Sequence, residues 1–177
     1  GTRSKAKMVN YGIVYGLSAY GLADRLQIPQ EEAQEFIDRY LARFPAVAQF
    51  MKDAVTQAEQ HGYVSTLFGR RRQIPEIRAR NWQVRKLGER LAVNTVIQGT
   101  AADIIKVAMV GAHKALADAG LQTELVLQIH DELLFEGPAG EMDAAAEIAR
   151  REMVGAFDLD PPLAVDVGVG SDWLAAK

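Results

Sequence analysis

The chain has 177 residues, of which 49% are hydrophobic, and its formal net charge of -3 argues against a uniformly basic nucleic-acid-binding protein. It contains no cysteine, which excludes disulfides, thiolate metal sites and a cysteine nucleophile, so any metal must be held by oxygen or imidazole ligands. No apolar run approaches the roughly 20 residues of a membrane span and no leader precedes a cleavage site, so we expect an intracellular protein without membrane contact.

Helices are predicted for the first part of the chain. Residues 3–16 show helical spacing, and Ser18 is a suitable cap for a short second helix. Pro29 and Pro45 each precede or begin a further amphipathic helix, the second of which extends to about His61. We therefore expect a helical region before the first β-prone residues.

A small hairpin is predicted next, within the segment YVSTLFGRRRQIP. β-prone residues flank a turn around Gly69, and Pro75 ends the second strand. The hairpin begins a basic block, which we interpret as a candidate phosphate-contacting surface, with a solvated charged face as the alternative. The cations of this block are Arg70, Arg71, Arg72, Arg78, Arg80, Arg85, Lys86 and Arg90, opposed by Glu76 and Glu89.

A long helical region is predicted from residue 79 to 119. It is expected to be interrupted near residues 97–100, and Gly120 closes it as a C-terminal stop. The start of this region divides the chain into two predicted domains, 1–78 and 79–177.

The remaining segment predicts a β-hairpin and a helix. Residues 123–129 and 133–136 are apolar and rich in β-prone residues, and an amphipathic helix is expected over 140–157. The alternating stretch LAVDVGVGSDW is interpreted as a terminal strand. This order of elements is typical of an α+β fold in which a small antiparallel β-sheet packs on helices.

Two adjacent carboxylates, Asp131 and Glu132, follow His130 at the expected tip of the second hairpin. Such a pair between apolar strands is costly unless solvent or a cation reaches it. Hard oxygen ligands suit Mg²⁺, and a stiff hairpin would fix a metal-binding carboxylate in place. An exposed turn without a metal is the alternative.

Three hydrogen-bonding residues, Arg90, Asn94 and Gln98, lie four residues apart and would share one helical face. Such side chains could contact the minor-groove acceptors that both kinds of base pair present, which predicts contact without sequence readout. Alternatively, Arg90 is solvated and the two amides cap the interruption near 97–100.

The opening helix presents two cations and then two aromatic rings on one face, because Arg3, Lys7, Tyr11 and Tyr15 are also spaced four apart. The cations could contact a triphosphate, and the rings could stack on a sugar and bases. The alternative is two solvated cations and two tyrosines buried against the next helix. Gly12, between the rings, fits either close helix packing or the approach of a flat ligand.

Together these motifs resemble family A DNA polymerases, the bacterial DNA polymerase I group. The opening stripe from Arg3 to Gly16 is similar to the nucleotide-binding fingers motif of that family. The segment QIHDE resembles its third catalytic motif, and RLAVNTVIQGTAAD resembles its primer-template-contacting helix. Because LFGRRRQIP and VGVGSDW are also similar, the resemblance covers essentially the whole chain.

The resemblance implies a C-terminal portion of such a polymerase, with residues 1–78 in the fingers and 79–177 in the palm of a partial right-hand fold. It implies template-directed transfer of deoxynucleotidyl groups from deoxynucleoside triphosphates to a primer 3′-hydroxyl, assisted by two Mg²⁺ ions. It also implies a bacterial, cytoplasmic and nucleoid-associated protein. Asp131 would bind metal, with Glu132 as a supporting ligand.

The resemblance also assigns substrate-binding roles. Lys7 would contact phosphate and is the candidate proton donor to pyrophosphate, while Arg3 would hold the triphosphate tail. Tyr11 would pack against the incoming sugar and base, and Tyr15 would lie by the templating position. The residues implied at the primer-template are Arg90, Asn94, Gln98 and His130.

Two substitutions and one missing motif depart from the family pattern. Tyr11 stands where many members carry phenylalanine, and its hydroxyl could replace a contact of the nucleotide 3′-hydroxyl, which predicts weak discrimination against dideoxynucleotides. Ser4 replaces an arginine common beside Arg3. The first catalytic motif, with the other metal-binding aspartate, would lie in the missing upstream part of the same polypeptide, so we expect the fragment alone to be inactive. The alternatives are a non-catalytic primer-template-binding relative and an unrelated soluble α+β domain.

Overall fold

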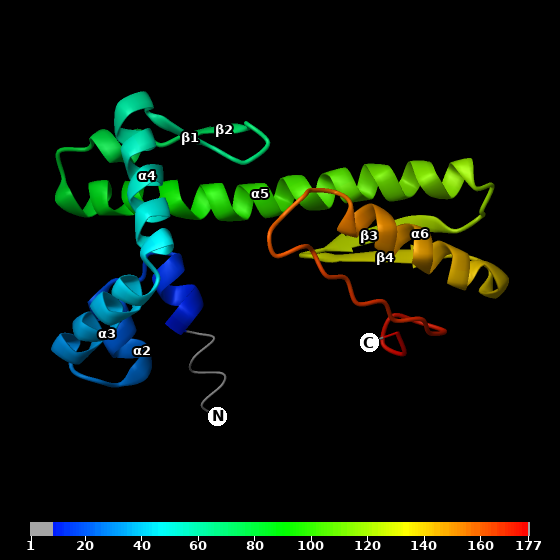
Figure 1. Ribbon diagram of the computed structural model, residues 1–177, viewed down its shortest axis with the longest axis horizontal. Helices are drawn as coiled ribbons and strands as arrows, with labels where there is room; N and C mark the ends of the chain where they lie inside the picture. The colour runs from blue at the N-terminus through cyan, green and yellow to red at the C-terminus, as the bar shows by residue number, and fades with distance from the viewer. Residues whose placement is uncertain (1–8, 177) are drawn as a thin grey trace. The chain divides into compact units, whose positions relative to one another are not determined.

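The computed structural model describes residues 9–176 of the chain, which divides into two compact units, Gly1–Thr100 and Ala101–Lys177. Helices predominate, and two small two-stranded antiparallel sheets accompany them (Figure 1). The predicted α+β class is therefore confirmed. The boundary between the two compact units falls inside the longest helix, and the contacts of the first hairpin explain its position.

The helices of the first unit follow the sequence prediction closely. Residues 9–14 are helical, and the Ser18 Oγ accepts a hydrogen bond from the Gly21 amide at 3.2 Å, which caps the next helix. Pro45 occupies the first turn of its helix, where its missing amide proton costs nothing. The helices that follow residues 9–14 are α2 (Ala19–Leu26), α3 (Gln30–Arg43) and α4 (Pro45–His61).

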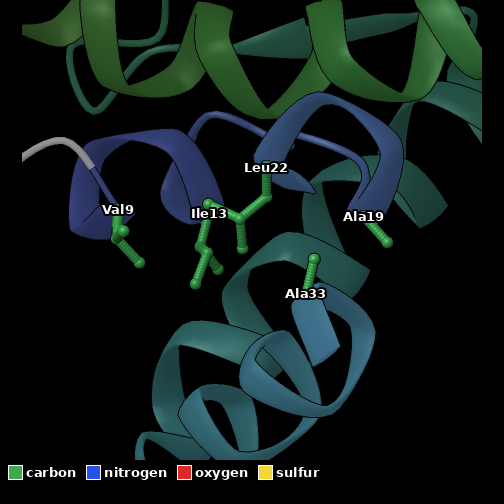
Figure 2. Packing of buried hydrophobic residues seen from close by; sticks show 5 residues of the cluster. All are labelled: Val9, Ile13, Ala19, Leu22 and Ala33. Atoms are coloured by element: carbon green, nitrogen blue, oxygen red, sulfur yellow. The ribbon is translucent and has the colours of Figure 1, made fainter. Parts of the chain in front are cut away.

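Residues 9–14 are anchored by one apolar face. Val9 and Ile13 are 6% and 2% exposed, and they pack in a cluster with buried residues of α2 and α3. Figure 2 shows these side chains together with Leu22, Ala19 and Ala33. Since Val9 and Ile13 are one helical turn apart, their burial fixes which face of this helix remains outside.

The first hairpin consists of β1 (Tyr63–Ser65) and β2 (Arg71–Gln73), which pair antiparallel and lead into the 3₁₀ helix η1 (Pro75–Arg78). The hairpin packs on the first part of α5 (Trp82–Asp118). The Leu67 amide donates to Thr100 Oγ1 at 3.1 Å, and Arg72 Nη1 donates to Thr95 Oγ1 at 3.0 Å. These bonds explain why α5 up to Thr100 belongs to the first unit.

The predicted interruption of the long helix near residues 97–100 is wrong, because α5 is continuous from Trp82 to Asp118. The glycine in that stretch has a packing role instead. A Cβ on Gly99 would lie 2.7 Å from Thr66 Cγ2, so only glycine lets the hairpin approach this closely. Gly120 does end the helical region as predicted, with a left-handed φ of 69°.

Helix α5 is also long and apolar enough to cross a membrane by length and composition, contrary to our expectation from the sequence. One third of its most apolar window, 33%, is buried within the structure. A core helix of a soluble protein passes the same test. A single such helix is therefore weak support for a membrane protein.

The second unit contains β3 (Glu124–Ile129), β4 (Glu132–Glu136), the 3₁₀ helix η2 (Ala139–Glu141) and α6 (Met142–Val154). The two strands pair antiparallel with one register irregularity. The predicted terminal strand in LAVDVGVGSDW is wrong, since residues 163–173 contain no strand. Alternating apolar residues make a strand only when a neighbouring strand supplies hydrogen bonds, and no described residue pairs with this segment.

Small side chains dominate the interior of both units. Alanine is the commonest residue among the buried hydrophobic positions, and the largest side chains that are almost completely buried are Ile13, Leu22, Ile74 and Val64. In the second unit the buried alanines lie on α5 and α6. There a Cβ on Gly111 would lie 2.8 Å from Glu152 Oε2 and 3.6 Å from Glu152 Cβ, so the Glu152 side chain of α6 packs on Gly111 of α5.

Candidate nucleotide and nucleic-acid site

The two tyrosines of the opening stripe form a pair on the outer face of residues 9–14. Their ring centroids are 6.2 Å apart with an interplanar angle of 13°, and Tyr11 is 53% exposed. The alternative that both rings are buried is therefore wrong for Tyr11. The predicted cations Arg3 and Lys7 lie outside the residues that the structure describes.

A glycine-terminated cap ends the helix immediately after Tyr15. Gly16 has a left-handed φ of 75°, its amide donates to the Ile13 carbonyl at 2.9 Å, and the Leu17 amide donates to the Gly12 carbonyl at 2.7 Å. These two bonds define a Schellman motif. A Cβ on Gly12 would lie 2.8 Å from Leu17 Cδ2, so Gly12 serves the close packing of Leu17 on the helix.

The same cap lies against the predicted DNA-contacting stripe. A Cβ on Gly16 would lie 3.0 Å from Arg90 Cγ, so the aliphatic stem of Arg90 packs on the end of the opening helix. The structure thus brings Tyr15 and Arg90, which are far apart in the sequence, into one region of the first unit. Sequence reasoning had treated them as two separate motifs.

The three residues of the α5 stripe lie on one uninterrupted helix, as their spacing predicted. The alternative in which Asn94 and Gln98 cap an interruption is wrong, because the helix has none there. Arg90 and Gln98 are exposed. The Oδ1 atom of Asn94 is buried and has no hydrogen-bond partner among residues 9–176, so it is an acceptor left over for a ligand or water.

The acidic pair of the second unit lies at a hairpin tip, as predicted. Ile129 pairs with Glu132, which leaves His130 and Asp131 as a two-residue turn. His130 has a left-handed φ of 54°, and its carbonyl accepts a hydrogen bond from Gln128 Nε2 at 2.6 Å. A left-handed conformation costs a residue other than glycine about 1–2 kcal/mol, and such strain concentrates at functional sites.

The chemistry of this turn partly fits a divalent metal. Asp131 and Glu132 are exposed carboxylates, and their oxygens are the donors that Mg²⁺ prefers. Within residues 9–176, however, no group of three or more potential ligands converges on one point. Two carboxylates can supply only part of an octahedral shell, so water, substrate or another carboxylate would have to complete a metal site here.

Sequence reasoning missed the residue that fastens the base of this hairpin. Glu141 accepts hydrogen bonds from the Gln122 amide at 2.9 Å, the Thr123 amide at 3.0 Å and Thr123 Oγ1 at 2.8 Å. The bond from the Thr123 hydroxyl, followed by that from the Gln122 amide, lowers the pKa of Glu141. A Cβ on Gly137 would overlap Thr123, so the residue before β3 and the residue after β4 are held together.

The family model for DNA polymerase family A matches residues 1–175, and the chain belongs to this family. The chain is 50% identical over 174 residues to the DNA polymerase I of Mycobacterium bovis, covering 98% of the chain and 19% of that protein. It is also 50% identical over 175 residues to the DNA polymerase I of Bacillus caldotenax, covering 99% of the chain and 20% of that protein.

A solved structure shares the fold. The polymerase domain of Pol1 from M. smegmatis, in complex with DNA primer-template and dNTP, superposes with a TM-score of 0.95 at 49% identity. The match covers 98% of this chain and 31% of that one. The expected partial polymerase fold is thereby confirmed. The chain spans about one fifth of the length of the curated relatives it matches.

Proposed function

We propose that this chain is part of a DNA-directed DNA polymerase that transfers deoxynucleotidyl groups from deoxynucleoside triphosphates to a primer 3′-hydroxyl. Family membership and the name of the relatives support the reaction. The solved relative that holds a primer-template and a dNTP supports these partners. The observation that carries the proposal is the acidic hairpin turn, in which Asp131 is fixed between two paired strands.

In this proposal Asp131 binds Mg²⁺ and Glu132 is a supporting ligand. Bound magnesium, two ions in the complete site, would stabilise charge on the attacking and leaving oxygens. The left-handed turn at His130 and the hydrogen bond from Gln128 hold the two carboxylates at the tip before any ligand arrives. Preorganisation of this kind avoids an ordering cost during the reaction.

The substrate contacts are assigned to residues of the opening helix and to the polar residues along one face of α5. Tyr11 packs against the incoming nucleoside and Tyr15 lies by the templating base, while Arg3 and Lys7 hold the triphosphate and Lys7 donates a proton to pyrophosphate. Residues assigned to the primer-template are Arg90, Asn94, Gln98 and His130. The exposed Tyr11 ring and the exposed Arg90 support these roles, as does Asn94 Oδ1, which has no hydrogen-bond partner among residues 9–176.

The isolated chain is proposed to be inactive, because another carboxylate must complete the metal site. The missing upstream part of the same polypeptide would supply it. The two-stranded sheet β3–β4 supports this, since Val126 and Leu127 on β3 are 48% and 45% exposed. A hairpin with exposed apolar residues is only marginally stable alone and offers its edges to a further strand. In the cell the protein would work in the bacterial cytoplasm, at the nucleoid and without a membrane.

The test is Mg²⁺-dependent primer extension by the full-length polypeptide, wild type against Asp131→Asn. Extension that is lost in the variant, while primer-template binding persists, supports both the reaction and the role of the carboxylate. Binding without extension by either protein would instead identify a non-catalytic primer-template-binding relative. Extension by the 177-residue chain alone would overturn the proposed incompleteness.

A further inference from the structure

The second hairpin has one residue more on β3 than on β4. Leu125 pairs with Phe135, and the next pair toward the turn is Leu127 with Leu134. Val126 is therefore the extra residue of a β-bulge, which lies three residue pairs from the acidic hairpin turn. Because a bulge bends its strand and increases the local twist, this bulge sets the direction in which the hairpin carries the turn.

The register on the other side of the bulge continues to the base of the hairpin. Extending the Leu125–Phe135 register by two residues places Thr123 opposite Gly137. The two are in close contact, since an added Cβ on Gly137 would lie 2.7 Å from Thr123 Cα. A bulge disrupts the ladder locally, so a hairpin with a free base would gain hydrogen bonds by extending the register of the turn along both strands. The bulge therefore depends on what holds the base.

Glu141 holds the base in this register. Its Oε2 atom accepts hydrogen bonds from the Gln122 amide, the Thr123 amide and the Thr123 hydroxyl, at 2.9, 3.0 and 2.8 Å. Glu141 directly precedes α6, yet in the described part of the chain its side chain forms no capping hydrogen bond with that helix. Its carboxylate thus joins the start of β3 to the segment that follows β4.

The strands themselves have little to fix their register. No residue of β3 or β4 is buried in the described part of the chain, whereas Thr123 at the base is 2% exposed. Burial of one face normally specifies the register of a strand, and strands without a buried face are prone to slip. In this unit the hydrogen bonds of Glu141 perform that role.

We propose that Glu141 is a positioning residue for the polymerase reaction. By holding Thr123 beside Gly137 it maintains the bulge, and the bulge sets the orientation of Asp131 for metal binding. The inference rests on the proposed metal-binding role of Asp131. Mg²⁺ demands nearly ideal octahedral geometry, and a displacement of about 1 Å in an active site can cost on the order of 100-fold in rate. A change of register at the base is therefore expected to impair metal use at the turn without removing a ligand.

The test measures the Mg²⁺ concentration for half-maximal primer extension by the full-length polypeptide. Glu141→Ala should raise this concentration about tenfold, the lower end of the effect of residues that orient metal ligands, and leave the Kd for primer-template unchanged. Glu141→Gln keeps one acceptor oxygen and should give an intermediate value. Deletion of Val126 removes the bulge but leaves the hydrogen bonds of Glu141, and it should raise the Mg²⁺ requirement as Glu141→Ala does.

A second readout does not depend on activity. Electron paramagnetic resonance measures Mn²⁺ bound by the protein without DNA or nucleotide, and the sites that count are those that Asp131→Asn abolishes. Glu141→Ala should weaken Mn²⁺ binding at these sites about tenfold. There are two controls on α6: Glu147→Ala removes the same charge from an exposed position, and Ala149→Gly destabilises the helix at a position that is 6% exposed. Both should use metal as the wild type does.

A lower melting temperature of Glu141→Ala with unchanged Mg²⁺ requirement and Mn²⁺ binding, the pattern expected of Ala149→Gly, would overturn the proposal. Where Glu141→Ala does not fold, Glu141→Gln and the Val126 deletion decide the matter by the same measurements. Extension that survives Asp131→Asn would overturn the proposed function. Extension that is lost in Asp131→Asn, together with wild-type metal use in Glu141→Ala, would overturn the positioning role alone.

Discussion

Gly16→Ala gives the sharpest test of the contact between the opening helix and α5. The residue has a φ of 75°, and alanine in this left-handed conformation costs about 1–2 kcal/mol. Alanine also restricts the unfolded chain more than glycine does, which offsets about 0.4–1 kcal/mol of this cost. In addition, the new methyl group would lie 3.0 Å from Arg90 Cγ, and relieving that contact by moving an exposed side chain costs about 1 kcal/mol. The expected net destabilisation is about 2 kcal/mol.

Gly69→Ala is the matched control within the same unit. Gly69 has a φ of 80°, and nothing lies within 4 Å of its added Cβ, so this variant carries the backbone cost alone, about 1 kcal/mol. Arg90→Ala removes the crowding atom. In that background the cost of Gly16→Ala should fall to that of Gly69→Ala.

Urea unfolding is the assay, followed by tryptophan fluorescence. Trp82 lies in the first unit and Trp173 in the second, so a Trp173→Phe background reports the first unit alone even if the units unfold separately. Equal costs for Gly16→Ala and Gly69→Ala, or a Gly16→Ala cost that is unchanged by Arg90→Ala, would refute the contact as an energetic link.

Three further outcomes are expected. The pKa of Glu141 is lowered in the folded chain, so its contribution to stability is present above the ordinary carboxyl pKa and is lost as the pH falls through the folded pKa. The difference in unfolding free energy between the wild type and Glu141→Gln should therefore disappear on acidification. A difference that does not change with pH in urea unfolding would contradict this. Gly137→Ala should destabilise the second unit by about 1–3 kcal/mol or more, because the added methyl group overlaps the backbone as well as the side chain of Thr123. Thermal unfolding measures this loss of stability. The control is Gly140→Ala, whose added methyl group would have no atom within 4 Å. Tyr11→Phe should raise discrimination against dideoxynucleotides in primer extension by the full-length polypeptide, and an unchanged incorporation ratio would reject a role for the hydroxyl.

Local signals in the sequence predicted most of the elements. The cap at Ser18, the proline at Pro45 and the stop at Gly120 each act within one helical turn, so their outcome does not depend on the rest of the chain. The turn at His130 and Asp131 was predictable for the same reason, since two β-prone segments separated by polar residues favour a hairpin.

The errors concern features that depend on distant partners. From the sequence alone, a glycine within an apolar helix indicates an interruption. In the structure, the missing side chain of Gly99 leaves space for Thr66 of the first hairpin to pack on the helix. The terminal stretch alternates as a strand does, yet no described residue pairs with it. Likewise, nothing local links Glu141 to Thr123 or Gly16 to Arg90, so both contacts became visible only in the structure.

The prevalence of alanine in the interior determines which sequence changes the fold can accept. Truncating a buried alanine to glycine removes one methyl group and creates only a small cavity, so most such substitutions should destabilise the fold only mildly. Enlargement is different, because buried positions such as Ala58, Ala92 and Ala112 are 0% exposed and have no space for a longer side chain. Over evolutionary time these helices are therefore expected to drift among small residues and to reject larger ones, which keeps the spacing between elements constant while the surface varies.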